Sequence, residues 1–254
     1  MEVFGDYAYY YNSFYRDKNY AAEASIVDKL LKKYSSNNLG KILNMGCGTG
    51  RHDLELWRLG YHVHGIDISK TMIEVAKRQL ENIDKNELVF EVGDICSYYV
   101  QDAYDSVISL FHVMSYQTGN DVLFNAFKTA AAALVKSGIF LFDVWYGPGV
   151  LSDKPSVRVK KVEDEKNILI RNANPVMHAQ KNIVDVNYDV LVIDKKTDTV
   201  KEIKETHSMR YLFTPEVEFL LDMAGFELLD CIDCDTLEAA DYNSWTAYFI
   251  ARKR

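Results

Sequence analysis

The sequence predicts an α/β protein with a Rossmann-like, doubly wound, mostly parallel sheet of seven strands and an inserted antiparallel β-sheet cap. Two observations predict the parallel sheet. Strand-like and helix-like segments alternate over residues 41–145, and several strand-like segments are continuous apolar runs, which is typical of strands covered by helices on both faces. A third observation predicts the cap, because the pattern changes after Pro148 to strand-like runs separated by polar turns.

The order of elements in the first part of the chain follows from hydrophobic periodicity and helix caps. A tyrosine-rich stretch comes first, and apolar residues at helical spacing then predict a helix over Ala21–Tyr34. Five strands are expected, at Lys41–Met45, Tyr61–Asp67, Leu88–Val92, Tyr104–Leu110 and Ile139–Val144. The helices between them are expected at His52–Leu59, from the N-cap Ser69 to about Leu80, and at Asp121–Val135.

The insertion and the C-terminal segment complete the expected sheet. The strands of the insertion are expected at Val157–Val162, Asn167–Ile170, Val184–Ile193 and Val200–Tyr211. Thr214 is expected to be the N-cap of the next helix, with Pro215 at its first position. Two final strands are expected to pair at the sheet edge, at Glu227–Cys234 and Trp245–Arg252. Residues 1–148 and 213–254 are therefore expected to form one domain, interrupted by a cap over residues 149–212.

The charge balance and the absence of long apolar segments exclude several classes of partner. The 254 residues include 29 Lys and Arg against 37 Asp and Glu, which gives a formal net charge of −8. A net acidic chain is a poor general binder of polyanions, so we expect no nucleic-acid partner. No apolar stretch approaches the length that crosses a bilayer, and no secretory signal is visible. We therefore expect no membrane partner and a cytoplasmic location.

A glycine loop after the first expected strand is the most informative motif. It reads Gly46-x-Gly48-x-Gly50 and precedes an expected helix, so it lets a ligand approach the main chain closely. The dinucleotide fingerprint G-x-G-x-x-G fails because its sixth position is Arg51, and no P-loop lysine follows. The spacing favours a ligand without a phosphate at the helix N-terminus and disfavours an NAD-dependent oxidoreductase.

Two carboxylates follow the next two expected strands. Asp67 ends the second strand, where an acidic side chain can accept hydrogen bonds from both hydroxyls of a ribose. Asp94 follows the third strand and can accept from the exocyclic amine of adenine, with Ile95 as a flat apolar wall. The alternative interpretation is a solvent-exposed strand-end Asp67 and a helix-capping Asp94. Together with the glycine loop, these residues indicate an adenosine pocket.

The sequence at this point resembles the class I S-adenosylmethionine-dependent methyltransferases. The matching segments are Ile42–Gly50, Gly65–Met72, Gly93–Asp94, Tyr104–Leu110 and Thr214–Phe226. The resemblance implies S-adenosylmethionine as cofactor, S-adenosylhomocysteine as product, and no metal. The cofactor-binding residues that it implies are Tyr11, Tyr20, Asn44, Gly46, Cys47, Gly48, Asp67, Ile68, Met72, Asp94, Ile95 and Leu110. The family usually has an acidic residue at the position of Asn44, so this chain loses a charge that would complement the cofactor.

The tyrosine-rich opening and the inserted sheet are similar to those of small-molecule methyltransferases, including aminosugar N-methyltransferases. The resemblance implies that the N-terminal segment closes over the cofactor, and that the insertion caps the substrate and forms a homodimer contact. Packing of the tyrosines on the domain is the alternative for Tyr11 and Tyr20. The lone Cys231-x-x-Cys234 is expected to pack and to bind no metal.

Methyl transfer from a sulfonium needs orientation, exclusion of water and, for some acceptors, a base. His112 follows the fourth expected strand and is the predicted catalytic base, with Tyr11 as a second catalytic candidate. The alternative for His112 is that it only shapes the pocket. Substrate-binding residues are expected to be His112, Trp145, Tyr146, His207 and Arg210. A further acceptor contact is expected from His178, on a loop-like stretch over residues 172–180.

The predicted function is therefore methyl transfer to N or O of a small polar metabolite, such as an amino or hydroxyl sugar. Two alternatives stay open. Asn44 keeps open a non-catalytic module that binds S-adenosylmethionine for regulation. A methyltransferase that acts on a macromolecule is disfavoured, because Leu110-Phe-His-Val stands where exocyclic-amine methyltransferases have Asn/Asp-Pro-Pro-Tyr/Phe.

Overall fold

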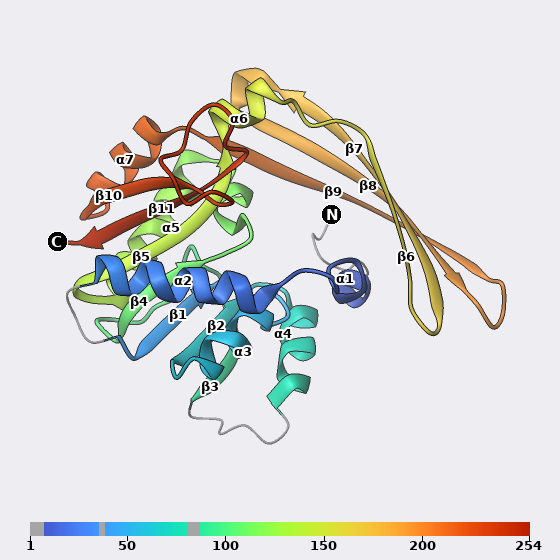
Figure 1. Ribbon diagram of the computed structural model, residues 1–254, viewed down its shortest axis with the longest axis horizontal. Coiled ribbons are helices and arrows are strands. Elements are labelled where there is room, and N and C mark those ends of the chain that lie inside the picture. The colour runs from blue at the N-terminus through green and yellow to red at the C-terminus, as the bar shows by residue number, and fades with distance from the viewer. Residues whose placement is uncertain (1–7, 36–38, 81–86) are drawn as a thin grey trace.

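The computed structural model describes residues 8–35, 39–80 and 87–254 (Figure 1). The strands of its central sheet are β1 (Lys41–Met45), β2 (His62–Asp67), β3 (Leu88–Val92), β4 (Tyr104–Ser109), β5 (Leu134–Tyr146), β10 (Phe226–Asp233) and β11 (Thr246–Lys253). The parallel strands lie in the order β3-β2-β1-β4-β5, so the chain order reverses between β1 and β4. Strand β11 pairs antiparallel with β5, and β10 pairs with β11 at the edge.

Helices cover both faces of this sheet. The helices are α1 (Ala8–Phe14), α2 (Tyr20–Tyr34), α3 (Arg51–Arg58), α4 (Lys70–Lys77), α5 (Asn120–Ala133), α6 (Gly147–Ser152) and α7 (Thr214–Met223). Short 3₁₀ turns are η1 (Arg78–Leu80), η2 (Val113–Tyr116) and η3 (Ala179–Lys181). Helices α2, α3 and α4 pack on one face, and α5 and α7 pack on the other.

Strand β5 shows why the sheet needs two layers of helices. Phe140 and Phe142 belong to the core under α5 and α7, whereas Ile139 and Leu141 belong to the core under α2 and α3. All four side chains are fully buried, and successive side chains of a strand point to opposite faces. A strand with apolar residues at consecutive positions is therefore stable only between two helical layers, as the sequence predicted.

The insertion forms a long antiparallel sheet that reaches away from the central sheet (Figure 1). Its strands are β6 (Arg158–Glu163), β7 (Asn167–His178), β8 (Ile183–Asp194) and β9 (Val200–Leu212). The end of β9 returns to the central sheet, where Tyr211 and Leu212 pair in parallel with Trp145 and Tyr146. Helix α1 lies beneath the insertion and contacts both β6 and α4.

Three differences from the predicted boundaries bear on how the elements connect. Strand β7 continues to His178, where a loop was expected, because its second half pairs in register with β8. Strand β5 begins at Leu134 directly after α5, although Lys136–Gly138 was expected to separate helix and strand. Thr214 is the first helical residue rather than the N-cap. The Glu216 carboxylate accepts the Phe213 N–H at 3.0 Å, so the carboxylate satisfies that backbone donor.

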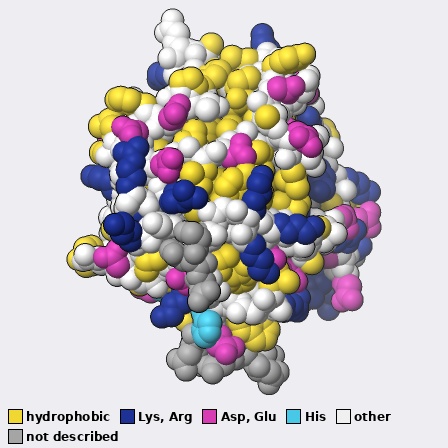
Figure 2. All heavy atoms as spheres, turned by 60° about the vertical axis from the view of Figure 1, so that its left-hand side comes forward, with side chains coloured by type: hydrophobic (Ala, Val, Ile, Leu, Met, Phe, Trp, Pro, Cys, Tyr) yellow, Lys and Arg dark blue, Asp and Glu magenta, His cyan; other side chains and the backbone are white. Residues whose placement is uncertain are grey.

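The outer surface is mixed in character. On the side shown in Figure 2, acidic and basic side chains are interspersed and apolar side chains show between them. Within the described residues, the helices are too short or too polar to cross a bilayer.

Candidate active site

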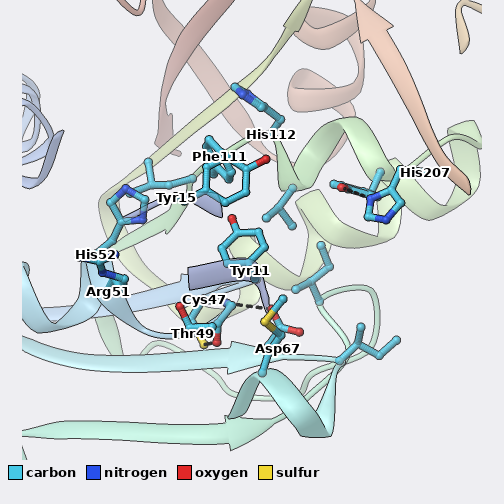
Figure 3. Close-up of a pocket in the computed structure, with 18 of the residues that line it drawn as sticks. Tyr11, Tyr15, Cys47, Thr49, Arg51, His52, Asp67, Phe111, His112 and His207 are labelled. Atoms are coloured by element: carbon cyan, nitrogen blue, oxygen red, sulfur yellow. Dashed lines mark hydrogen bonds between the residues drawn. The ribbon is translucent and has the colours of Figure 1, made fainter. Parts of the chain in front are cut away.

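A cavity of about 440 Å³ lies at the carboxyl ends of β1, β2 and β4. This volume is within the range of small-molecule sites, and the position is the crevice where the strand order reverses. Tyr11 of α1 and Tyr15, the residue directly after α1, close the cavity, and His207 of β9 stands on another side (Figure 3). The cavity therefore has a half built by the parallel sheet and a half built by α1 and the insertion.

The glycine loop after β1 forms the first wall through its main chain. Gly46 and Gly48 both have positive φ, at 84° and 56°. A Cβ on Gly46 would lie 2.5 Å from Cγ1 of Val113, so a side chain there would clash. A Cβ on Gly48 would have no heavy atom within 4 Å. The loop is thus held by close packing on one side and leaves its backbone open to a ligand on the other.

Asp67 ends β2 beside this loop. Its Oδ2 accepts the Gly48 N–H and its Oδ1 accepts the Ser69 N–H, both at 2.8 Å. Burial raises the pKa of this carboxyl, while the two backbone donors oppose that rise. Each carboxylate oxygen has a second lone pair, so Asp67 is fixed in place and can still accept from two hydroxyls.

The end of the next strand, β3, provides an apolar slot. Met72, Ile95 and Leu110 line it as buried side chains, while Ile68 is 71% exposed. Asp94 stands at the slot, with its Oδ1 accepting the Cys96 N–H at 2.9 Å. An apolar slot with an acceptor at one end fits a purine with an exocyclic amine, and the slot adjoins Asp67. These residues therefore fit the adenosine part of S-adenosylmethionine.

Asn44 does not line the cavity, contrary to the prediction that it contacts the cofactor. It is 1% exposed, and its Nδ2 donates to Oδ2 of Asp53 at 2.8 Å. Its side chain points from β1 toward α3, because Leu43 and Met45 take the opposite face. Burial raises the pKa of Asp53 to about 7. The sequence reasoning missed this buried amide–carboxyl pair beneath the glycine loop.

His112 lines the cavity and is paired with a buried carboxylate. Its Nδ1 lies 2.6 Å from Oδ2 of Asp143, and its main-chain N–H donates to the same oxygen at 3.1 Å. Phe111 and His112 both have left-handed backbone conformations, with φ of 65° and 67°. With Nδ1 turned to Asp143, the second ring nitrogen is the one that can exchange a proton with a ligand.

Aromatic and buried polar side chains form the rest of the cavity. Trp145 and Trp245 lie with ring centroids 4.9 Å apart, and both line it. Tyr116 and Tyr188 approach His207, whose ring packs edge-on to each of them. This half presents large apolar surfaces with a few placed polar groups, which is the usual composition of a small-molecule site.

Three expected substrate contacts lie outside the cavity lining. Arg210 pairs with Glu216 at 3.2 Å, and the Tyr146 hydroxyl lies 3.1 Å from Oγ1 of Thr214. Strand alternation explains both, because Trp145 and Met209 face the cavity and their neighbours face away. His178 pairs with Asp185 on the exposed insertion at 2.8 Å and does not line the cavity.

The other predicted site residues do line the cavity. They are Tyr11, Tyr20, Gly46, Cys47, Gly48, Asp67, Ile68, Met72, Asp94, Ile95, Leu110, His112, Trp145 and His207. The lining residues that the sequence reasoning missed include Phe111, Tyr116, Tyr188, Met209 and Trp245. A usable signal existed for Tyr188 and Met209, because alternation along β8 and β9 places one face of each strand toward the central sheet.

Helix α1 is tied to both halves. Oγ1 of Thr49, in the glycine loop, donates to Oδ1 of Asn12 at 2.9 Å. On the insertion side, Arg171 donates to the Tyr15 hydroxyl at 3.2 Å and Lys160 donates to the Phe14 carbonyl at 2.6 Å. Tyr15 also packs on Phe111 next to His112. The helix therefore connects the glycine loop, the cavity and the insertion.

Comparison with known proteins agrees with this geometry. The family described as "Methyltransferase domain" matches residues 42–138. A dTDP-3-amino-3,4,6-trideoxy-alpha-D-glucopyranose N,N-dimethyltransferase of Streptomyces venezuelae is 23% identical over 225 residues, covering 88% of this chain and 91% of that protein. The segment matched by the family, residues 42–138, contains the glycine loop, Asp67, Asp94 and His112.

Two solved structures share the fold over the whole chain. Streptomyces venezuelae DesVI has a TM-score of 0.81 at 21% identity and covers 100% of both chains. CalS10, an amino pentose methyltransferase of Micromonospora echinaspora solved with S-adenosylmethionine bound, has a TM-score of 0.77 at 18% identity, covering 100% of this chain and 99% of that one. The two structures show that the chain has the class I methyltransferase fold, and the family match shows a methyltransferase domain over residues 42–138. The chain is therefore an S-adenosylmethionine-dependent methyltransferase.

Proposed function

We propose that this enzyme methylates the amino group of an amino sugar carried on a nucleotide. The observation that carries the proposal is the juxtaposition of His112, paired with Asp143, with an aromatic compartment next to the adenosine pocket. We call this aromatic compartment the acceptor compartment, because the methyl acceptor binds there in this proposal. Residues 149–212 act in the proposal as its cap. Residues 1–148 and 213–254 act as the cofactor-binding domain.

S-adenosylmethionine supplies an activated methyl group on a sulfonium when bound. The residues of the chain must then orient the acceptor, exclude water and remove a proton. An ammonium group has no lone pair for attack, so its proton must leave first. His112 is assigned that step, because its Nδ1 lies 2.6 Å from Oδ2 of Asp143 and Nε2 is then the nitrogen that takes the proton. Tyr11, whose ring lies 6.4 Å from that of Phe111, closes the cavity over the acceptor.

The chemistry of the compartment supports a sugar ring. Trp145, Trp245 and Tyr188 offer apolar faces, and His207 and Tyr116 offer polar atoms at one side. A sugar ring likewise has apolar faces and hydrogen-bonding edges. Relatives point the same way, since a protein of Streptomyces fradiae, 24% identical over 213 residues, is named dTDP-3-amino-3,6-dideoxy-alpha-D-glucopyranose N,N-dimethyltransferase.

The test combines binding and turnover. Calorimetric titration with S-adenosylmethionine and S-adenosylhomocysteine is expected to show binding of both. Incubation with S-adenosylmethionine and dTDP-3-amino-3,6-dideoxy-α-D-glucopyranose, followed by mass spectrometry, is expected to show singly and doubly methylated sugar. Cofactor binding without methylation of this sugar or its 3,4,6-trideoxy analogue would contradict the proposal.

A further inference from the structure

A second histidine of the acceptor compartment is buried, and the proton removal assigned to His112 does not use it. His207 is 2% exposed and lies on β9 between two polar partners. Its Nδ1 lies 2.8 Å from the Tyr116 hydroxyl, and its Nε2 lies 3.1 Å from Oε2 of Glu205. Glu205 is 7% exposed, so a carboxylate, an imidazole and a phenol form one buried chain that reaches the cavity at Tyr116.

The chemistry of these groups fixes the direction of the hydrogen bonds. A carboxylate can only accept, so the His207 nitrogen that faces Glu205 must carry the proton. In the neutral imidazole the other nitrogen is then an acceptor, and the Tyr116 hydroxyl must donate to it. A phenol that donates its proton in this way offers oxygen lone pairs to other groups. Glu205 thus determines, through His207, the direction in which the Tyr116 hydroxyl donates its hydrogen bond.

We propose that Tyr116 is a specificity-determining residue that accepts a hydrogen bond from a hydroxyl or amine of the acceptor. Glu205 and His207 are positioning residues that hold its hydroxyl in the accepting direction. This inference rests on the proposed function for the identity of the acceptor. Figure 3 shows that His112 and His207 lie on different sides of the cavity, so proton removal and acceptor recognition belong to separate histidines.

The arrangement also explains why a carboxylate is buried in the insertion. A buried charge is costly unless its partners are fixed. Glu205 and His207 are two residues apart on one strand, so they project to the same face, and Tyr188 pairs with Glu205 across the sheet. The Tyr188 ring packs edge-on to His207 with centroids 4.9 Å apart. The insertion therefore holds the chain rigidly against η2, which carries Tyr116.

The kinetic test uses dTDP-3-amino-3,6-dideoxy-α-D-glucopyranose as the acceptor. Tyr116→Phe is expected to raise the KM for this sugar by about three- to tenfold, the scale of one lost hydrogen bond, with kcat and S-adenosylmethionine affinity changed less. His207→Leu is expected to raise KM similarly, because the Tyr116 hydroxyl loses the acceptor that fixes its direction. His207→Gln is the matched variant: its amide can donate to Glu205 and accept from Tyr116, so it is expected to recover most of the affinity.

A spectroscopic test does not depend on the acceptor. ¹⁵N NMR of the imidazole in the S-adenosylhomocysteine complex, assigned by the signals lost in His207→Gln, is expected to show neutral His207 with the proton on Nε2. A proton on Nδ1, or a charged ring, would overturn the inference. So would unchanged KM in Tyr116→Phe when the wild-type enzyme methylates the sugar. No turnover by the wild-type enzyme would instead contradict the proposed function, while the NMR result would still decide the direction of the chain.

Discussion

The two halves of the cavity are built in different ways. The cofactor half uses backbone groups and the ends of neighbouring parallel strands: the glycine loop, Asp67 and the slot at Asp94 and Ile95. The acceptor half uses side chains from α1, η2, β5, β8 and β9, which the insertion brings together. The comparison teaches that one half is specified by local sequence spacing and the other by tertiary packing, so mutations in the two halves should have separable effects.

The largest effect of a substitution is expected at His112, where the two halves of the cavity meet. His112→Ala is expected to reduce kcat by about 10²- to 10⁴-fold, the scale of general base catalysis. The reason is that no base remains to take the proton from the ammonium group of the acceptor. Calorimetry should show nearly unchanged affinity for S-adenosylmethionine. His178→Ala is the matched control, since His178 pairs with Asp185 on the exposed insertion, and it should keep full kcat. An equal loss in both variants would rule out the assigned role.

A smaller effect, confined to the cofactor half, is expected from Asp67→Ala. Losing the acceptor for the ribose hydroxyls should weaken S-adenosylmethionine binding by about 1.5–3 kcal/mol, the scale of hydrogen bonds to a charged group. Calorimetry measures this change directly, and the acceptor KM at saturating cofactor should move little. Unchanged cofactor affinity would show that the ribose lies elsewhere.

The smallest expected effect concerns stability beneath the cofactor half. The pKa of Asp53 is raised to about 7 in the folded protein, so the folded state binds more protons than the unfolded state between the ordinary aspartate range and that value. The resulting stabilisation is present at low pH and is lost as pH rises through about 7. Asp53→Asn keeps an acceptor for Asn44 but cannot ionise. It should therefore match the wild type near pH 4 and exceed it at pH 8 by on the order of 1–2 kcal/mol in urea unfolding. Parallel pH profiles for the two proteins would contradict this assignment.

The spacing of residues in the sequence was enough to place the residues of the cofactor half along the cavity. Gly46, Gly48, Asp67 and Asp94 follow strands at positions that any parallel sheet brings to one edge. Asn44 was misplaced because the direction of its side chain depends on how β1 packs against α3.

The acceptor half was recovered only in part. Trp145 and His207 line the cavity as expected, whereas Tyr146 and Arg210 face away from it. A single step of strand alternation makes that difference, and a short apolar run does not fix which of its residues face the cavity. The pairing of His112 with Asp143 depends on the left-handed turn after β4, for which the sequence carries no glycine signal.

The junction between the insertion and the central sheet has an evolutionary consequence. The insertion leaves from the end of β5 and returns there, where Tyr211 and Leu212 pair with Trp145 and Tyr146. Its two ends are thus neighbours, so the segment between them can be lengthened, shortened or exchanged as a unit without moving the strands that hold the cofactor. A lineage with this architecture can exchange the side chains that β8 and β9 bring to the cavity by replacing one contiguous stretch of gene, while the strands that carry the glycine loop stay unchanged.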